Sequence, residues 1–279
     1  MHSAILQNGK LITAMEYIKE LHGSQIFCLD PSCKSPVSFV PGTDSVAAHF
    51  KTSGKGGSIH TPNCGFYKSL SFQDSVTKVS EYQQVFKNKG LNEIVIRMNL
   101  NALDPDYQSK TVEREDNKKE DKEDPVIKVK NDNPTPQTLN TLKAVKKLFT
   151  SNEPDLLASI LISIKGIKLP ISYLIRNYTE AHDALWAENL NSNLPYFVHG
   201  TIEKVIRREK VWYINFSIVD GRYFSLVVFE PYFKHFTYKD EQLIGKEILS
   251  YGHLKKNTFT KSRESTEMQI KSNKYLAFL

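Results

Sequence analysis

The strongest constraint on this chain is a cluster of metal-binding residue types near its N-terminus. All three cysteines fall within residues 28–64, in the segments Cys28-Leu-Asp-Pro-Ser-Cys33 and His60-Thr-Pro-Asn-Cys64, and His49 lies between the two. Zinc in a structural site takes four cysteine or histidine ligands in a tetrahedron, and both spacings fall within the range of such sites. We therefore predict a structural Zn²⁺ site formed by the three cysteines and one histidine, with His49 and His60 both open as the fourth ligand.

The alternative is that the cysteines are free and packed as small apolar side chains. Their neighbours argue against it, because Cys33 follows a serine and precedes a lysine, and Cys64 lies between Asn63 and Gly65. The sequence has no apolar run of about 18 residues and no basic-then-apolar start, which predicts neither a membrane span nor a secretion signal. We expect a cytoplasmic protein, where reduced cysteines favour a metal over disulfides.

Residues 4–66 carry a pattern that extends beyond the cysteines. It contains a glycine turn at Gly9, the strand-like Val37-Ser-Phe-Val-Pro-Gly42 and the pair His49-Phe50. This segment resembles the zinc-binding N-terminal region of competence protein CoiA-like proteins. It departs from their pattern in two places, because Cys28 and Cys33 are separated by four residues rather than two, and Thr52 replaces the second histidine of His-Phe-x-His. The resemblance implies a zinc module tied to DNA handling in a bacterium, phage or mobile element.

CoiA-like proteins continue into a nuclease-like domain, which this chain does not match. Its candidate carboxylates form no Asp…Glu-x-Lys arrangement around a strand: Glu81, Glu93, Asp104 and Asp106. The sequence also lacks a phosphate-binding glycine loop, a serine or cysteine triad and a His-Glu-x-x-His motif. We therefore expect a non-enzymatic protein, with a divergent metal-dependent nuclease as an alternative.

Composition shifts divide the chain into four parts, and the predicted fold class is α+β multidomain. Residues 1–110 are expected to form a small β-rich zinc-binding domain with a helix at 71–89. Residues 111–137 include the run Glu113–Asp124, which has no apolar residue and predicts a linker or exposed loop. Residues 138–194 are expected to be helical, with helices at 138–149, 154–164 and 171–190. Residues 195–279 are expected to form a five-stranded OB-fold-like β-barrel.

The C-terminal part changes to the alternating pattern of strands. Strands are expected at 196–206, 211–219, 222–230, 245–254 and from 267 onward, with a partly helical connection at 231–243. The segment resembles nucleic-acid-binding OB domains in the pattern Val198-x-Gly200-x-Ile202 and in the later Gly245-Lys-x-Ile248. Five strands with a helix or loop between the third and fourth are typical of that fold.

Alternation also predicts a binding face on this part. It holds 14 Lys/Arg against 9 Asp/Glu, which is +5 of the chain's net +6, and 16 of the 30 aromatic residues. A strand face of aromatic and small polar side chains edged by cations is suited to stacking on single-stranded nucleic acid. We expect single-stranded DNA as the partner, with docking of protein partners as the alternative. The predicted residues are Arg207, Arg208, Lys210, Tyr213, Asn215, Arg222, Tyr223, Phe229, Lys255 and Lys256.

Overall fold

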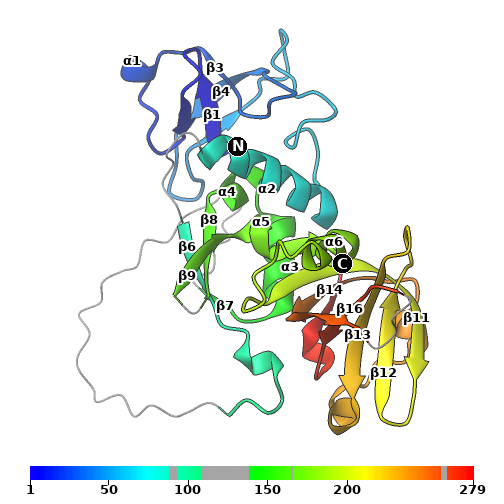
Figure 1. The fold of residues 1–279 in the computed structure, drawn as a ribbon. Helices are drawn as coiled ribbons and strands as arrows, with labels where there is room; N and C mark the ends of the chain where they lie inside the picture. Colours follow the sequence, from blue (N-terminus) through cyan, green and yellow to red (C-terminus); the bar gives the residue numbers. More distant parts are fainter. Residues whose placement is uncertain (88–93, 109–137, 165, 259–262) are drawn as a thin grey trace, which may run out of the picture. The chain divides into compact units, whose positions relative to one another are not determined.

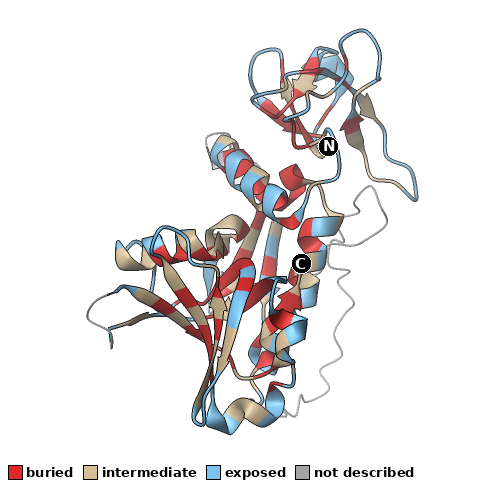
Figure 2. Ribbon diagram, turned by 90° about the vertical axis from the view of Figure 1, so that its right-hand side faces the viewer, coloured by how far each residue is buried: buried red, intermediate tan, exposed pale blue. Residues whose placement is uncertain are grey.

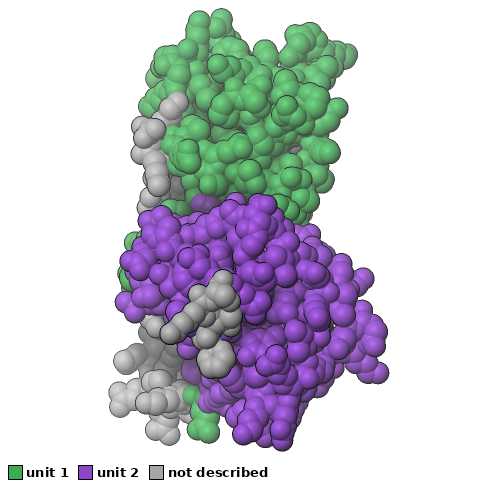
Figure 3. Space-filling view, turned by 45° about the vertical axis from the view of Figure 1, so that its right-hand side comes forward, with its two compact units in different colours: residues 1–97, 108–138, 147–170 green, residues 98–107, 139–146, 171–279 purple. Residues whose placement is uncertain are grey.

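The computed structural model describes residues 1–87, 94–108, 138–164, 166–258 and 263–279. The chain divides into two compact units, coloured separately in Figure 3. Unit 1 contains residues 1–97, 108–138 and 147–170, and unit 2 contains residues 98–107, 139–146 and 171–279. The linker predicted at 111–137 lies outside the described residues.

Unit 1 begins with a five-stranded antiparallel sheet in the order β2-β1-β3-β4-β5 (Figure 1). The strands, and the short helix between the second and third, are β1 (Ser3–Leu6), β2 (Leu11–Thr13), α1 (Lys19–His22), β3 (Ile26–Cys28), β4 (Pro36–Val40) and β5 (His49–Lys51). The glycine turn at Gly9 joins β1 and β2 in a hairpin, where Gly9 adopts a positive φ of 77° and its amide donates to the Leu6 carbonyl. Tyr17, Phe39 and Phe50 pack together in the core of this sheet.

The rest of unit 1 joins helices to a second sheet. Its elements are α2 (Phe72–Lys87), β6 (Ile94–Met98), α4 (Pro154–Ala158), β8 (Ile160–Ile164) and β9 (Ile167–Pro170). The helix expected at 154–164 begins at Pro154 as predicted but ends at Ala158, so its second half is wrong. Ile160, Ile162 and Ile164 are buried in alternation, and β8 pairs in parallel with β6. Branched side chains favour a half-buried strand over a helix, and pairing with a distant strand decided the outcome.

The segment expected to be helical, 138–194, is therefore mixed. Besides α4, β8 and β9 it contains β7 (Thr138–Leu139), α3 (Leu142–Ser151), α5 (Ile171–Leu174), β10 (Ile175–Asn177) and α6 (Tyr178–Trp186). The long helix expected at 171–190 is interrupted because Asn177 caps a new helix. Its side chain accepts from the Thr179 amide, and Glu180 completes a capping box. Among the described residues, the structure has no helix that combines the length and apolar character needed to span a membrane.

Unit 2 is built on a larger sheet in the order β15-β16-β13-β12-β11-β14-β17, with β10 paired to β11. Its strands, and the turns and helices between them, are β11 (Tyr196–Arg207), β12 (Val211–Phe216), β13 (Tyr223–Phe229), η2 (Glu230–His235), α7 (Asp240–Leu243), β14 (Glu247–Gly252), β15 (Leu254–Asn257), β16 (Ser265–Gln269), η3 (Asn273–Tyr275) and β17 (Leu276–Phe278). A further short turn, η1 (Asn101–Leu103), precedes β7 in the chain.

This sheet differs from the expected five-stranded barrel in two ways. Its strand pairing does not close into a ring, because the path runs from β15 to β17 and, among the described residues, no pairing joins these two end strands. Strands β10, β15 and β17 also join it. The predicted succession of strands along the chain is present as β11, β12, β13, β14 and β16, with η2 and α7 between the third and fourth.

The inner face of the sheet holds the core of unit 2 (Figure 2). Ile214, Phe216 and Leu226 are buried there. Helix α6 packs on this side, where the Tyr178 ring stacks on Phe216 with ring centroids 5.0 Å apart. Gly200 permits this contact, because a β-carbon at that position would overlap the Tyr178 ring. On the opposite face of β12 and β13, Tyr213, Asn215, Tyr223 and Ser225 are partly exposed.

Candidate metal site and candidate binding face

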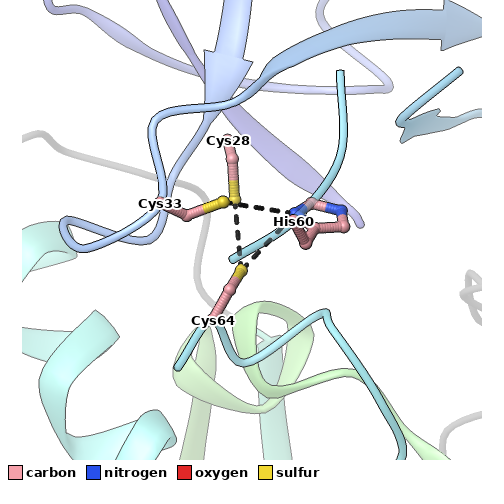
Figure 4. Close-up of side chains that lie close together, drawn as sticks. All are labelled: Cys28, Cys33, His60 and Cys64. Carbon is pink, nitrogen blue, oxygen red and sulfur yellow. Dashed lines mark hydrogen bonds between the residues drawn. The ribbon is translucent and has the colours of Figure 1, made fainter. Parts of the chain in front are cut away.

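Four of the five predicted metal-binding residues come together in unit 1 (Figure 4). Cys28 ends β3 and Cys33 lies in the following turn, while His60 and Cys64 lie in the loop between β5 and α2. Their ligand atoms all lie within 4.8 Å of one another. Among the described residues, this is the group of cysteine, histidine and carboxylate side chains placed to hold a metal ion.

Three distances within this cluster are close to those of a tetrahedral site. The Sγ atoms of Cys28 and Cys64 are 3.7 Å apart, and His60 Nδ1 lies 3.5 Å from Cys33 Sγ and 3.4 Å from Cys64 Sγ. Metal–sulfur bonds of about 2.3 Å and metal–nitrogen bonds of about 2.0 Å at tetrahedral angles separate two sulfurs by about 3.8 Å, and a sulfur and a nitrogen by about 3.5 Å. These three separations fit a tetrahedral site, and the four residues are placed so that they can hold a metal ion.

His49, the other predicted histidine, lies elsewhere. Its Nδ1 is 3.0 Å from the Ala47 carbonyl oxygen, and it is absent from the cluster. Of the two histidines left open by the sequence, the structure places His60 beside the cysteines. The His60 ring also lies 5.8 Å from the Phe66 ring.

The thiols differ in their acidity. Burial on its own raises the pKa of Cys33, but hydrogen bonds with Ser35, the Thr61 amide and His60 outweigh it and bring that pKa to about 6. The pKa of Cys28 is raised, first by the hydrogen bond it shares with Cys64 and then by burial. A cation among the sulfurs favours the thiolate form of all three, since a coordinating thiol is deprotonated.

Asp30, a residue that the sequence interpretation missed, lies inside the Cys28–Cys33 turn. It is fully buried, and its carboxylate accepts hydrogen bonds from Ser32, Gly65 and Tyr82. Burial raises the pKa of Asp30, yet these hydrogen bonds outweigh burial and lower it to about 2, so the carboxylate is charged at neutral pH. In the sequence, Asp30 between Leu29 and Pro31 looked like an ordinary turn residue.

The candidate binding face is a groove of about 500 Å³ on the half-exposed side of the sheet in unit 2. We call it the sheet groove. Its lining is Glu203, Lys204, Ile206, Arg208, Tyr213, Asn215, Phe216, Ile218, Tyr223, Phe224, Ser225, Asn257, Arg263, Ser265 and Glu267.

A row of polar side chains crosses the sheet groove. Strand register aligns Lys204, Asn215, Ser225, Glu267 and Lys255 on neighbouring strands. The Ser225 hydroxyl donates to Asn215 Oδ1 at 2.8 Å. Hydrogen-bonding groups are therefore present across the middle of the face, with a lysine at each end.

An arginine–tyrosine pair lies on each side of this polar row. Tyr213 precedes Asn215 on β12 and Tyr223 precedes Ser225 on β13, so the antiparallel pairing places the two rings on opposite sides of the row. The guanidinium carbon of Arg208 lies 5.7 Å from the Tyr213 ring centroid, and that of Arg263 lies 4.6 Å from the Tyr223 centroid. Each pair offers a flat ring and a cation at one position.

The structure gathers only part of the predicted nucleic-acid face. Arg208, Tyr213, Asn215 and Tyr223 line the sheet groove, and Lys255 extends its polar row. The remaining predicted residues lie outside the lining: Arg207, Lys210, Arg222, Phe229 and Lys256.

Three of those remaining cations have acidic partners. Arg207 binds Asp240 and lies 4.1 Å above the Trp212 ring. Arg222 binds Asp183 and Asp220 at 2.6 and 3.1 Å.

Lys256, the third, binds Glu188 at 3.1 Å. The carboxylates of the alternative nuclease prediction pair with lysines: Glu81 with Lys78, and Asp104 and Asp106 with Lys271. Glu93 lies outside the described residues.

Comparisons with known proteins add little to this geometry. No family model and no curated protein matches the sequence, so the resemblance to CoiA-like proteins stays a prediction. Three solved structures show partial similarity, at TM-scores of 0.22, 0.22 and 0.23: the S. pombe Stn1-Ten1 complex, an aspartyl tRNA synthetase from Entamoeba histolytica, and an OBody bound to hen egg-white lysozyme.

Sequence identity to these structures is 14%, 7% and 13%, over 30%, 31% and 34% of this chain. The match spans 57% of the Stn1-Ten1 chain, 18% of the synthetase and 92% of the OBody. Because these TM-scores are low, the similarities establish no shared ligand.

Proposed function

We propose that this chain is a nucleic-acid-binding protein that holds single-stranded DNA in the sheet groove and carries a structural Zn²⁺ ion in unit 1. The order of β11, β12 and β13, the pairing of β11 with β14, and the parallel pairing of β13 with β16 support an OB-like arrangement for the sheet. OB-like sheets bind oligonucleotides on the face to which β12 contributes.

The observation that carries the proposal is the pair of arginine–tyrosine contacts on the two sides of the polar row. Tyrosine rings stack on bases of any sequence, and each stacked base contributes roughly 1–3 kcal/mol. An arginine beside each ring reaches a phosphate or stacks on a base with its planar guanidinium group. The amide and hydroxyl groups between them are placed to form hydrogen bonds with base edges.

A salt-dependent titration tests this proposal. We expect the full chain to bind a fluorescein-labelled single-stranded oligonucleotide, with an affinity that falls as salt is raised from 50 to 300 mM. Tyr213→Ala and Tyr223→Ala should each weaken binding by roughly 5- to 150-fold. Tyr107→Ala is the matched control, since this half-exposed tyrosine of unit 2 is outside the groove lining. Equal loss in all three variants, or no binding at 50 mM salt, contradicts the proposal.

Zinc is proposed because three sulfurs and one imidazole nitrogen lie within 4.8 Å of one another and together supply the four ligands that a structural zinc site takes. All four positions are filled by protein atoms, which is the arrangement of a structural rather than a catalytic site. We expect one zinc per chain by metal analysis. His60→Ala should lose zinc to a chelator much faster than wild type, and His49→Ala should not, because His49 lies outside the cluster.

Binding of a protein partner is a second candidate, and one observation favours it. Glu203 and Glu267 contribute two carboxylates to the sheet groove, and acidic groups suit a basic peptide better than a phosphate backbone. A competition experiment tests whether the two kinds of ligand share the groove: an oligonucleotide in excess should displace a protein partner that occupies the same site. For the nucleic-acid proposal to hold, the oligonucleotide must bind in the absence of any such partner.

A further inference from the structure

The buried carboxylate of Asp30 connects the metal cluster to helix α2. Its Oδ1 accepts hydrogen bonds from the Ser32 amide at 2.9 Å and the Ser32 hydroxyl at 2.6 Å. Its Oδ2 accepts from the Gly65 amide at 3.0 Å and the Tyr82 hydroxyl at 2.7 Å, and the Lys78 ammonium lies 3.2 Å away. These donors belong to three different segments of the chain.

Each segment has a defined relation to the metal ligands. Ser32 lies in the turn between Cys28 and Cys33, and the Cys33 amide donates to the Asp30 carbonyl at 3.0 Å. Gly65 directly follows Cys64. The carboxylate therefore joins the two loops that supply all three sulfurs.

The third segment is α2, which contributes no metal ligand. Tyr82 and Lys78 lie one turn apart on this helix and both reach Asp30. A second contact runs in parallel, since the Phe66 ring stacks on Tyr82 at 5.7 Å and lies 5.8 Å from His60. Helix α2 is thus attached to both a thiolate loop and the imidazole ligand.

An ordinary role in the turn does not account for these contacts. An aspartate that only shapes a turn needs the bonds from Ser32 and remains partly hydrated. Asp30 is 0% exposed and carries a charge that burial penalises unless every acceptor position is satisfied. The bonds from Gly65, Tyr82 and Lys78 supply that compensation, and they exist only while both loops and α2 keep their places.

We propose that Asp30 is a positioning residue that makes the metal site and helix α2 one cooperative unit, so that an ion at Cys28, Cys33, His60 and Cys64 orders α2. This inference rests on the proposed zinc site. Metal bonds hold the two thiolate loops together and thereby fix the Gly65 amide and the Asp30 carboxylate. When the ion leaves, the loops separate and the Asp30 carboxylate loses the hydrogen bond from the Gly65 amide. The contacts of Asp30 with Tyr82 and Lys78 on α2 then weaken.

Hydrogen exchange of the full chain, with and without zinc, is the direct test. We expect amides of residues 72–87 to exchange faster after zinc is removed with a chelator. Asp30→Asn should bind zinc about 10- to 100-fold more weakly, the range for partners that orient metal ligands. It should also alter the visible spectrum of the Co²⁺ form, a signature that a merely structural role leaves unchanged. With zinc bound, α2 of Asp30→Asn should exchange like α2 of the chelated wild type.

Glu81→Gln is the matched control. Glu81 is half-exposed and binds Lys78 at 2.9 Å, so this change removes a carboxylate from the same lysine without touching the metal loops. It should leave zinc affinity and the Co²⁺ spectrum at wild-type values. Tyr82→Phe, a milder change than Asp30→Asn, should also lower zinc affinity. The double variant should bind zinc as weakly as Asp30→Asn alone, because both changes break the same contact.

The two proposals fail in different ways. If wild type takes up no zinc, the metal site itself is refuted. A different result refutes only the positioning role of Asp30. In that case wild type binds zinc, the exchange rates of the α2 amides do not change when zinc is removed, and both Asp30→Asn and Tyr82→Phe bind zinc as tightly as wild type.

Discussion

Arg263 lies over the ring of Tyr223, with its guanidinium carbon 4.6 Å from the ring centroid. The two residues are distant in sequence and meet because β13 and β16 pair in parallel, with Ser265 opposite Tyr223. Arg222, the direct neighbour of Tyr223 in the chain, instead turns to Asp183 and Asp220. The cation beside Tyr223 in the sheet groove is therefore Arg263, which is distant in the sequence, and not its chain neighbour Arg222.

This contrast yields a matched pair of variants. Arg263→Gln should weaken binding of single-stranded DNA and reduce the slope of log affinity against log salt by about 0.7, the value for one phosphate of a single strand that a cation no longer neutralises. Arg222→Gln removes the same charge from a side chain already paired with two carboxylates, so its slope should stay at the wild-type value. Anisotropy titrations at four salt concentrations measure both. Equal slopes for the two variants would remove Arg263 from the interface.

Glu267 should oppose nucleic acid from within the polar row. Its carboxylate accepts from the Asn257 side chain at 2.5 Å, and it lies opposite Ser225 in the register. Glu267→Gln keeps an acceptor for Asn257 and removes a negative charge from the groove. Binding should become tighter by about 1 kcal/mol, or about fivefold, as expected for one charge at the surface. Glu241→Gln, at an exposed position on α7, is the control. A decrease in affinity for Glu267→Gln would show that this carboxylate contributes to binding rather than opposing it.

Local patterns predicted the strands of unit 2 well because burial there follows the backbone period. Ile214 and Phe216 are buried and Tyr213 and Asn215 face the groove, as simple alternation requires. The same approach failed at Ile160–Ile164, where a run of apolar residues fits a buried helix or a buried strand equally well. The parallel pairing with β6 decided the matter, and β6 lies more than 60 residues earlier in the chain.

The sites show the same division between local and long-range information. Spacing alone indicated the cysteines, because metal ligands come in short local pairs. It left His49 and His60 open, since the choice depends on how the loop after β5 folds back. Asp30 and Arg263 were missed because their partners, Tyr82 and Tyr223, belong to other elements.

Unit 2 should lose stability in mild acid through His199 on β11. This side chain is 2% exposed, and burial lowers its pKa to about 4. The Glu247 carboxylate, 3.7 Å from its Nδ1, favours the charged form but is itself nearly half-exposed, so burial dominates. Between pH 6.5 and 4 the unfolded chain binds a proton that the folded chain excludes, and stability therefore falls as pH decreases, by at most about 3 kcal/mol.

Tryptophan fluorescence isolates this effect, because the two tryptophans, Trp186 and Trp212, both belong to unit 2. Urea midpoints should decrease from pH 7 to pH 5 in wild type. His199→Gln, which cannot titrate, should show a smaller decrease whatever its stability at pH 7. His235→Gln, in the turn η2 that has no buried residue, is the control and should keep the wild-type dependence. An unchanged dependence in His199→Gln would assign the acid loss to other groups.

Gly65 should be intolerant of even one methyl group because of its approach to Tyr82. A β-carbon at this position would lie 2.5 Å from the Tyr82 hydroxyl oxygen and 3.3 Å from its Cζ atom. Gly65→Ala should therefore displace the hydroxyl from Asp30 and weaken zinc binding, in the same direction as Tyr82→Phe. In the Tyr82→Phe background the closest overlap is absent, so adding Gly65→Ala should cost less than it does in wild type. Chelator competition on the four proteins measures this coupling, and strictly additive losses would show that Gly65 affects the site independently of Tyr82.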